Sequence, residues 1–157
     1  MDTIRRDHYF GLVNKSKLKV SSNTLNNLFK RVCMYEIKSS ILGFEDYKKI
    51  EIEAFDNFFS IIQFDKEKTI SMNIANAKYL QNININLQDN ILEQLNCEDI
   101  KQLDIYFTMV IQEPIEDSVI NLGAPIIINE NKKLLGQFIV EDSRLFRMCT
   151  IKDISTL

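Results

Sequence analysis

Short runs in which apolar and polar residues alternate are the feature that most constrains the fold of this chain. The clearest run, KIEIEAF, places Ile50, Ile52 and Ala54 on one face and Glu51 and Glu53 on the other. A period of two residues is typical of a β-strand, because successive side chains of a strand point to opposite faces. A helix does not bury such a pattern on one side. The sequence therefore predicts strands in this region.

Further strand-like segments follow along most of the chain. Segments 58–64 and 69–75 flank the polar turn DKEK and predict a hairpin, while Asp89 is a candidate N-cap for one short helix, NILEQL. About eight or nine strands with a single helix predict a mainly β fold, an antiparallel β-barrel-like domain with one short helix. The other expected strands are YEIK, NININL (82–87), LDIYFTMVIQ (103–112), VINL (119–122), APIIIN (124–129) and LLGQFIVED (134–142).

Length and composition indicate one ordinary globular domain. The 157 residues are 45% hydrophobic and 26% charged, which is typical of a folded chain with a real core. No apolar run reaches the roughly 18–20 residues that cross a bilayer, and residues 1–30 lack a signal-peptide core. Three widely spaced cysteines, without a CxxC pair, favour reduced thiols. We therefore expect a cytoplasmic protein that does not bind membranes.

Charge divides the chain into two parts. Residues 1–33 hold seven Lys or Arg against two acidic residues, a balance of +5, whereas residues 34–157 hold twelve basic and twenty acidic residues, a balance of −8. We interpret 1–33 as a basic leader outside the core domain, with a short helix after Ser21 or Ser22. It is either a true appendage or the product of an upstream start codon. Residues 34–150 form the expected domain, whose acidic surface either repels nucleic acid and attracts a basic protein or serves solubility.

The chain lacks the residue combinations of common active sites. Its one histidine, His8, lies in the leader, so a catalytic triad or a His-rich metal site is not expected in the body. Acidic pairs occur at 45–46, 116–117 and 141–142, next to predicted turns where acids usually face water. The sequence predicts no enzyme, no metal and no cofactor, and it favours a binding module. A hydrolase that uses Glu116 or Asp142 is the remote alternative.

Four motifs, in order, resemble the FliW family of bacterial flagellar assembly factors. ILGFED (41–46) is similar to an early I-x-GFE signature, and residues 60–77 are similar to a conserved hairpin of that family. NLGAPIIIN (121–129) resembles a VNLLAPIVIN core, and GQFIVEDSRLFR (136–147) resembles the family's final motif. Residues 1–33 match no part of the pattern, and Met34 falls where FliW proteins normally begin. Ala77 and Gly123 depart from the usual Pro and Leu, and NININL replaces an acidic-aromatic segment.

The resemblance implies a β-barrel-like regulator with two competing protein partners and no enzymatic activity. One partner is flagellin, bound near its C-terminal assembly helix; the other is CsrA, a dimeric RNA-binding translational repressor. Free FliW weakens the hold of CsrA on flagellin mRNA, and accumulating flagellin captures FliW. The expected protein binds no nucleic acid directly and is a monomer when free. The alternative is a β-barrel adaptor or chaperone for another amphipathic client.

The segment SVINLGAPIIIN (118–129) is the most distinctive of the chain. We expect two strand pieces joined at Gly123, with Pro125 at a strand start or edge because it cannot donate to a ladder. Asn121 and Asn129 either fix turns or present amides to a partner. The candidates for the apolar contact, or for its support, are Phe44, Leu122, Ala124, Pro125 and Ile127. The acidic candidates, expected to face CsrA and to oppose RNA, are Glu113, Glu116 and Asp117.

Overall fold

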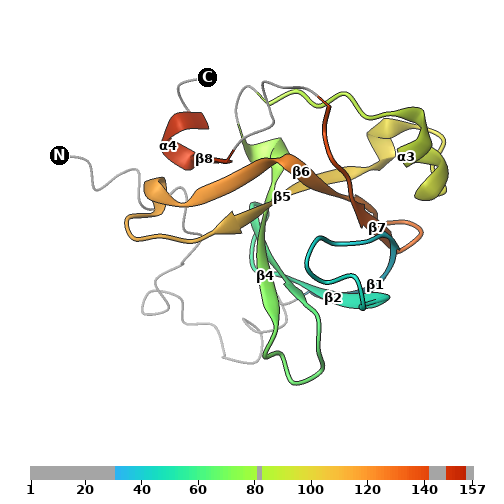
Figure 1. Ribbon diagram of the computed structural model, residues 1–157, viewed down its shortest axis with the longest axis horizontal. Coiled ribbons are helices and arrows are strands. Elements are labelled where there is room, and N and C mark those ends of the chain that lie inside the picture. Colours follow the sequence, from blue (N-terminus) through green and yellow to red (C-terminus); the bar gives the residue numbers. More distant parts are fainter. Residues whose placement is uncertain (1–30, 81–82, 142–147, 155–157) are drawn as a thin grey trace, which may run out of the picture.

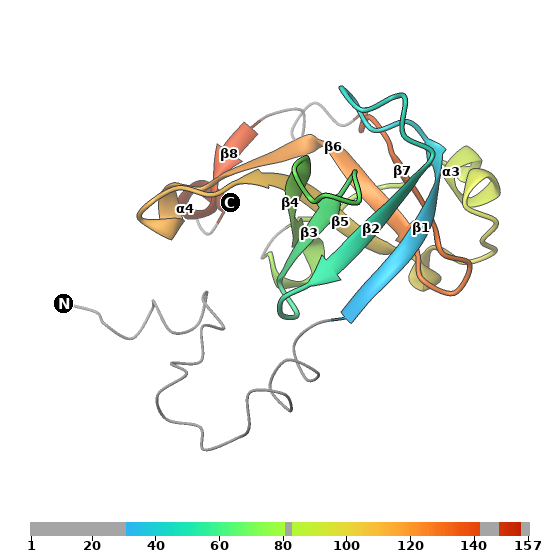
Figure 2. The ribbon, with the colours of Figure 1, turned by 90° about the horizontal axis from the view of Figure 1, so that it is seen from below.

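A closed β-barrel is the centre of the structure, a computed structural model that describes residues 31–80, 83–141 and 148–154 (Figures 1 and 2). Seven strands form the ring β5-β4-β3-β2-β1-β7-β6, and β6 returns to β5 to close it. An eighth strand, β8, pairs with β6 outside the ring. The strands are β1 (Arg31–Ser39), β2 (Lys49–Ala54), β3 (Phe59–Gln63), β4 (Ser71–Asn76), β5 (Asp104–Val110), β6 (Val119–Asn129), β7 (Leu134–Gln137) and β8 (Met148–Thr150).

The predicted mainly β, barrel-like fold is confirmed. Neighbouring strands are antiparallel, and the predicted hairpin is β3–β4. The exception is β1, which runs parallel to β7 with Ile37 opposite Leu135. Parallel pairing was not predicted, because the distant partners of a barrel seam leave no local signal in the sequence. The described residues hold two short α-helices where one was expected, α3 (Asp89–Gln94) and α4 (Ile151–Ile154), together with the 3-10 turns η1 (Ala77–Tyr79), η2 (Ile100–Gln102) and η3 (Ile115–Asp117).

The strand predicted in NININL is wrong. Residues 83–88 form no strand, and residues 81–82 lie outside the described part of the chain. The alternating apolar side chains still pack, since Ile85 is buried and Ile83 and Leu87 contact the same cluster. The strands of the ring already have neighbours on both edges over most of their length, and residues 83–88 pair with none of them.

Helix and strand starts differ from expectation in two further places. Gln88, not Asp89, occupies the N-cap of α3, and Asp89 is the acid of its first turn. Arg31 and Val32 belong to β1, where the end of a helix was expected. The remainder of that expected helix, from Ser21 or Ser22 to residue 30, lies outside the described residues.

Hydrophobic clusters occupy both sides of the barrel wall. The interior cluster contains Tyr35 of β1, Ile62 of β3 and Ile126 of β6. A second cluster, with Phe107 and Ile120, lies under α4 and β8, and a third lies between α3 and the wall. Each face of the central strand β6 therefore packs against a core.

Strand β6 is continuous from Val119 to Asn129, whereas two pieces were expected. In its pairing with β5, Ile126 lies opposite Tyr106 and Asn121 lies opposite Thr108. The four β6 residues 122–125 therefore face a single residue of β5. This irregularity contains Gly123, and it lets the first half of β6 pair with β8 and the second half with β7. Pro125 lies inside the strand, not at its start or edge. Its carbonyl accepts from the Phe138 N–H at 3.0 Å, just beyond the last pair of β6 with β7, so its missing N–H falls where that ladder has ended.

Candidate protein-binding surface

One exposed surface is formed by β5, the first half of β6 and β8. Met109, Ile120 and Cys149 are opposite one another and buried. The alternating residues of these strands point the other way, since side chains of a strand alternate between faces. We call this surface the hairpin face: Thr108, Val110, Val119, Asn121, Met148 and Thr150.

The hairpin face exposes large apolar side chains. Val110 is 54% exposed and Met148 62% exposed, and Ile111, which follows β5 directly, is also exposed. Single exposed hydrophobic residues are common, but neighbouring ones indicate a protein contact. The sequence did not identify Val110 and Ile111 because they follow the apolar Met109 directly, so the run MVI does not show which side chain faces solvent. The one indication in the sequence that Val110 is exposed is its position next to Met109, because neighbouring residues of a strand point to opposite faces.

An acidic loop, residues 113–117, lies at the tip of the β5–β6 hairpin, beside α4 (Figure 1). Glu113 and Asp117 are exposed, and Glu116 is half-buried. No Lys or Arg occurs between residues 102 and 131 of the sequence, while the neighbouring helix α4 contributes one of each sign. The structure therefore brings the three predicted acids together at the tip of the hairpin, directly after Val110 and Ile111.

The acidic loop is held by its own hydrogen bonds. The backbone N–H of Asp117 donates to the Pro114 carbonyl at 3.0 Å, and the N–H of Gln112 donates to Ser118 Oγ at 2.9 Å. Ile115 and Ser118 are buried, and the Ser118 carbonyl accepts from the Ile151 N–H of α4. The carboxylates are thus presented on a fixed turn, which lowers the entropic cost of binding.

The predicted apolar candidates of the segment 118–129 are in the core. The side chains of Leu122, Ala124, Pro125 and Ile127 are all buried, so in this structure they support the barrel. Of the two roles expected for them, contact or support, the geometry favours support. Contact of these four residues with a partner stays a prediction.

Asn121 and Asn129 both make internal hydrogen bonds. Asn121 Oδ1 accepts from the Gly123 N–H at 3.0 Å and fixes the irregularity of β6. Asn129 is buried, and its Nδ2 donates to the Leu95 carbonyl at 2.9 Å while its Oδ1 accepts from the Lys132 N–H at 3.2 Å. These bonds join α3 and the β6–β7 turn to the strand.

Phe44 lies far from the acidic loop. Its ring stacks on Phe64 with centroids 4.0 Å apart, and Tyr47 packs edge-on against Phe64. The three rings belong to the interior cluster of the barrel. The structure therefore separates Phe44 from the three predicted acids.

A concave region of about 570 Å³ opens at the end of the barrel where β1 begins and β6 ends. Its polar groups pair with one another: Tyr35 Oη donates to Glu130 at 2.6 Å, Lys133 Nζ lies 2.7 Å from Glu130, and Lys78 pairs with Asp104. A general base needs a carboxylate free to accept a substrate proton. These carboxylates neutralise cations and orient a phenol instead.

Burial and charge shift the pKa values of this barrel end. Desolvation, followed by the hydrogen bond to Glu130, raises the pKa of Tyr35 far above its usual range. Desolvation, followed by the charge of Asp104, raises the pKa of Tyr106 to about 12. Burial works against ionisation of Glu130, but the hydrogen bonds from Lys133 and Tyr35 outweigh it and lower the pKa. The cluster is therefore a charged carboxylate between a cation and neutral phenols.

The described residues form neither a metal cluster nor a membrane-spanning helix. Among the described residues, no three His, Cys, Asp or Glu side chains are placed to hold a metal ion together. The helices within the described ranges are too short and too polar to span a bilayer.

Comparison with known proteins agrees with the geometry. The family model described as FliW protein matches residues 21–148. That match begins before Met34, so the expectation that the leader has no counterpart in the family is wrong for residues 21–33. The division of the chain at residue 34 stays a prediction.

Curated relatives and a solved structure extend the match. Flagellar assembly factor FliW 1 of Wolinella succinogenes is 30% identical over 66% of this chain and 81% of its own. The FliW of Clostridium acetobutylicum is 28% identical over 80% of this chain and 84% of its own. A crystal structure of the flagellar assembly factor FliW superposes with a TM-score of 0.68 at 22% identity, covering 85% of this chain and 89% of that one, which supports the fold. The chain belongs to the FliW family of flagellar assembly factors.

Proposed function

We propose that this chain binds flagellin and CsrA in competition, and so couples the level of flagellin to its synthesis. The observation that carries the proposal is the acidic loop 113–117 beside the exposed apolar side chains of the hairpin face in a member of the FliW family. A surface with an apolar centre and a charged rim is typical of protein interfaces. Such a surface suits a basic or an amphipathic protein.

The acidic loop supports the part of the proposal that concerns CsrA. Glu113, Glu116 and Asp117 would lie against a basic RNA-binding dimer and lower the positive potential that attracts RNA phosphates. RNA affinity depends strongly on that potential, so a bound acidic protein weakens RNA binding without touching RNA. The chain itself binds no nucleic acid in this account.

The apolar side chains support the part that concerns flagellin. An amphipathic assembly helix exposes an apolar stripe in the monomer, and such stripes bind apolar surfaces. Val110 and Met148 offer exposed apolar area on the hairpin face, next to the loop proposed for CsrA. Overlap of the two contacts would make binding mutually exclusive, which is what a feedback regulator requires.

The same proposal makes the chain a cytoplasmic binding protein, monomeric when free, and not an enzyme. The ion pairs of the barrel end, Glu130 with Lys133 and Asp104 with Lys78, favour this because they leave these carboxylates engaged. The adaptor alternative differs only in its client.

Charge reversal tests the CsrA contact. The variant Glu116→Lys/Asp117→Lys places two cations on the acidic loop, and Glu67→Lys/Glu93→Lys makes the same charge change at exposed positions of the β3–β4 turn and α3. Titration calorimetry with CsrA should give a Kd raised at least about tenfold for the loop variant only, with a smaller difference at high salt.

Two results would contradict the proposal. Equal losses in both variants would mean that net charge rather than the loop governs binding. If the unmodified chain binds neither CsrA nor flagellin, the regulatory function is wrong and the adaptor alternative remains. Melting temperatures of all variants establish that they are folded.

A further inference from the structure

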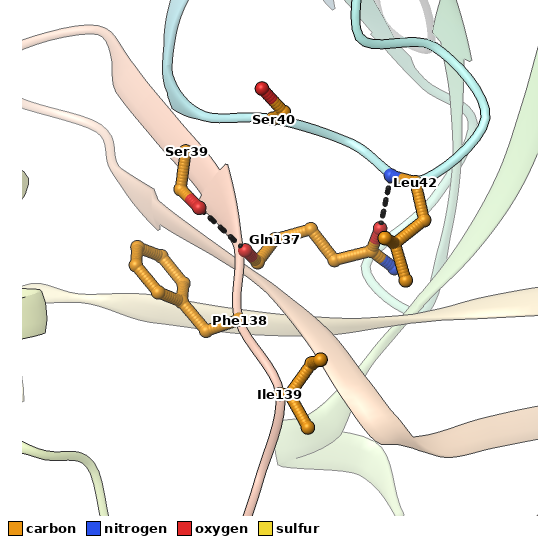
Figure 3. Close-up of a pocket in the computed structure, with 6 residues that line it drawn as sticks. All are labelled: Ser39, Ser40, Leu42, Gln137, Phe138 and Ile139. Atoms are coloured by element: carbon orange, nitrogen blue, oxygen red, sulfur yellow. Dashed lines mark hydrogen bonds between the residues drawn. The ribbon is translucent and has the colours of Figure 1, made fainter.

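A small groove lies where β1 turns away from β7 (Figure 3). It has a volume of about 450 Å³, and none of its lining residues is charged. Leu42 is 57% exposed and Ile139 is 63% exposed. The lining residues are Ser39, Ser40, Leu42, Gln137, Phe138 and Ile139.

The groove contains an open backbone edge. Beyond the end of β7, the N–H of Phe138 donates to the Pro125 carbonyl at 3.0 Å, and the N–H of Val140 donates to the Gly123 carbonyl at 2.9 Å. In an antiparallel pair every second residue directs its backbone groups to the neighbour, and the residues between direct theirs away. The N–H and C=O of Ile139 therefore point away from β6.

In the part of the chain that the structure describes, no other strand occupies that side. The last pair between β1 and β7 is Ser39 with Gly136, after which β1 turns away. Within the described ranges, neither backbone group of Ile139 has a hydrogen-bond partner. A short stretch of sheet edge is thus open to solvent, with an apolar side chain on it.

Gln137 holds the groove open. Its Oε1 accepts from the Leu42 N–H at 2.8 Å, its Nε2 donates to the Ala124 carbonyl at 3.0 Å, and its own carbonyl accepts from Ser39 Oγ at 2.8 Å. Figure 3 shows this side chain reaching across to Leu42. The loop is therefore fixed at a distance from the edge, and a ligand need not reorganise it.

We propose that the Ile139 edge binds an extended, uncharged aliphatic segment of a partner protein as an added β-strand. The open N–H and C=O call for an extended backbone, as in strand addition to other sheets. The lining is uncharged, and Leu42 and Ile139 present apolar side chains. Small apolar residues at alternate positions of the ligand would therefore fit it best. This site does not depend on the contacts proposed for the hairpin face.

A second copy of this chain is a poorer occupant. A specific dimer buries about 1,200 Å² or more in total, whereas the open edge centres on a single residue, Ile139, and ends near Val140. A peptide segment inserts into such a groove without needing a large flat surface. Self-association through this edge would reject the proposal.

Peptide binding to the full chain tests this site. The probe is a short, terminally blocked peptide of alternating valine and threonine, and its control has the same sequence with alternate backbone nitrogens methylated. We expect saturable amide shifts in NMR spectra at Leu42 and Phe138–Val140 with the first peptide, and a loss of about tenfold or more in affinity with the second, which cannot complete the ladder.

Three variants distinguish binding at the Ile139 edge from non-specific hydrophobic binding. Ile139→Pro removes the open N–H, Leu42→Ser removes the apolar wall, and Ile111→Ser removes an exposed apolar residue near the hairpin face. The first two should weaken binding by about tenfold, and the third should leave it unchanged. If Ile139→Pro fails to fold, Leu42→Ser and the methylated peptide decide.

Three results would overturn the proposal. Shifts centred elsewhere on the barrel would place the peptide at another site. Equal binding of the methylated peptide would exclude a β-ladder. A chain that dimerises in sedimentation experiments, with Ile139→Pro abolishing the dimer, would make the edge a self-association surface.

Discussion

Replacing Asn129 with alanine separates structure from recognition in the most distinctive motif of the chain. Asn129 is 2% exposed, and its amide joins three backbone groups: the carbonyls of Leu95 and Asn96, at 2.9 and 3.4 Å, and the N–H of Lys132, at 3.2 Å. The Asn96 contact is long and contributes little. The other two bonds fix the end of α3 and the β6–β7 turn.

The expected loss of stability follows from those two bonds. Truncation leaves the buried Leu95 carbonyl without its donor, and an unsatisfied buried polar group costs about 1–3 kcal/mol. For a chain of this size, such a loss lowers Tm by about 2–12 °C. The control, Asn121→Ala, removes one bond from a half-buried residue and should cost about 1 kcal/mol or less.

Urea unfolding followed by circular dichroism measures both variants, and calorimetry with CsrA and flagellin measures binding at a temperature where each is folded. We expect Asn129→Ala to be destabilised and to bind both partners with unchanged affinity. An Asn129→Ala protein that unfolds like the original but no longer binds would refute the reasoning, because the amide would then serve recognition.

Three further predictions concern the core and the barrel end. Leu122→Ala should lower the free energy of unfolding by about 2–5 kcal/mol in urea titrations, since the side chain is fully buried; a loss below 1 kcal/mol would mean that the site collapses around the cavity. The free energy of unfolding should fall as pH rises above 10. Tyrosines of the unfolded chain ionise there, while Tyr106 of the folded chain, with a pKa of about 12, stays protonated. Melting experiments at several pH values should therefore show a shallower fall for Tyr106→Phe. The lowered pKa of Glu130 stabilises the fold above pH 4.5 and this contribution is lost on acidification, so Glu130→Gln should show a weaker acid dependence, and an identical pH profile would exclude this contribution.

The sequence predicted those strands whose pairing is local. The β3–β4 hairpin has clear alternation on both sides of a polar turn, and both strands form as expected. The run NININL alternates equally well and forms no strand, because alternation reports which side chains can be buried and not whether a neighbouring edge exists. The parallel contact of β1 with β7 depends on residues about a hundred positions apart, for which the sequence holds no local signal.

The sequence was enough to predict which charged residues of the candidate site are exposed, but not which of its apolar residues are. Acids next to predicted turns were expected at the surface, and Glu113 and Asp117 are there. The apolar motif 121–129 was recognisable as special, yet its side chains fill cores on both faces of β6 because α3 and α4 cover the outside of the barrel. Which apolar residues stay exposed depends on where those helices end, which explains why Val110 and Met148 were missed.

The central claim is that this chain regulates by binding proteins, and one competition experiment tests it directly. Labelled flagellin mRNA is bound to CsrA, the chain is added until fluorescence anisotropy is constant, and flagellin monomers are then added. We predict that the chain releases the RNA and that flagellin restores the complex. RNA that stays bound at saturating chain, or a release that flagellin does not reverse, would contradict the account.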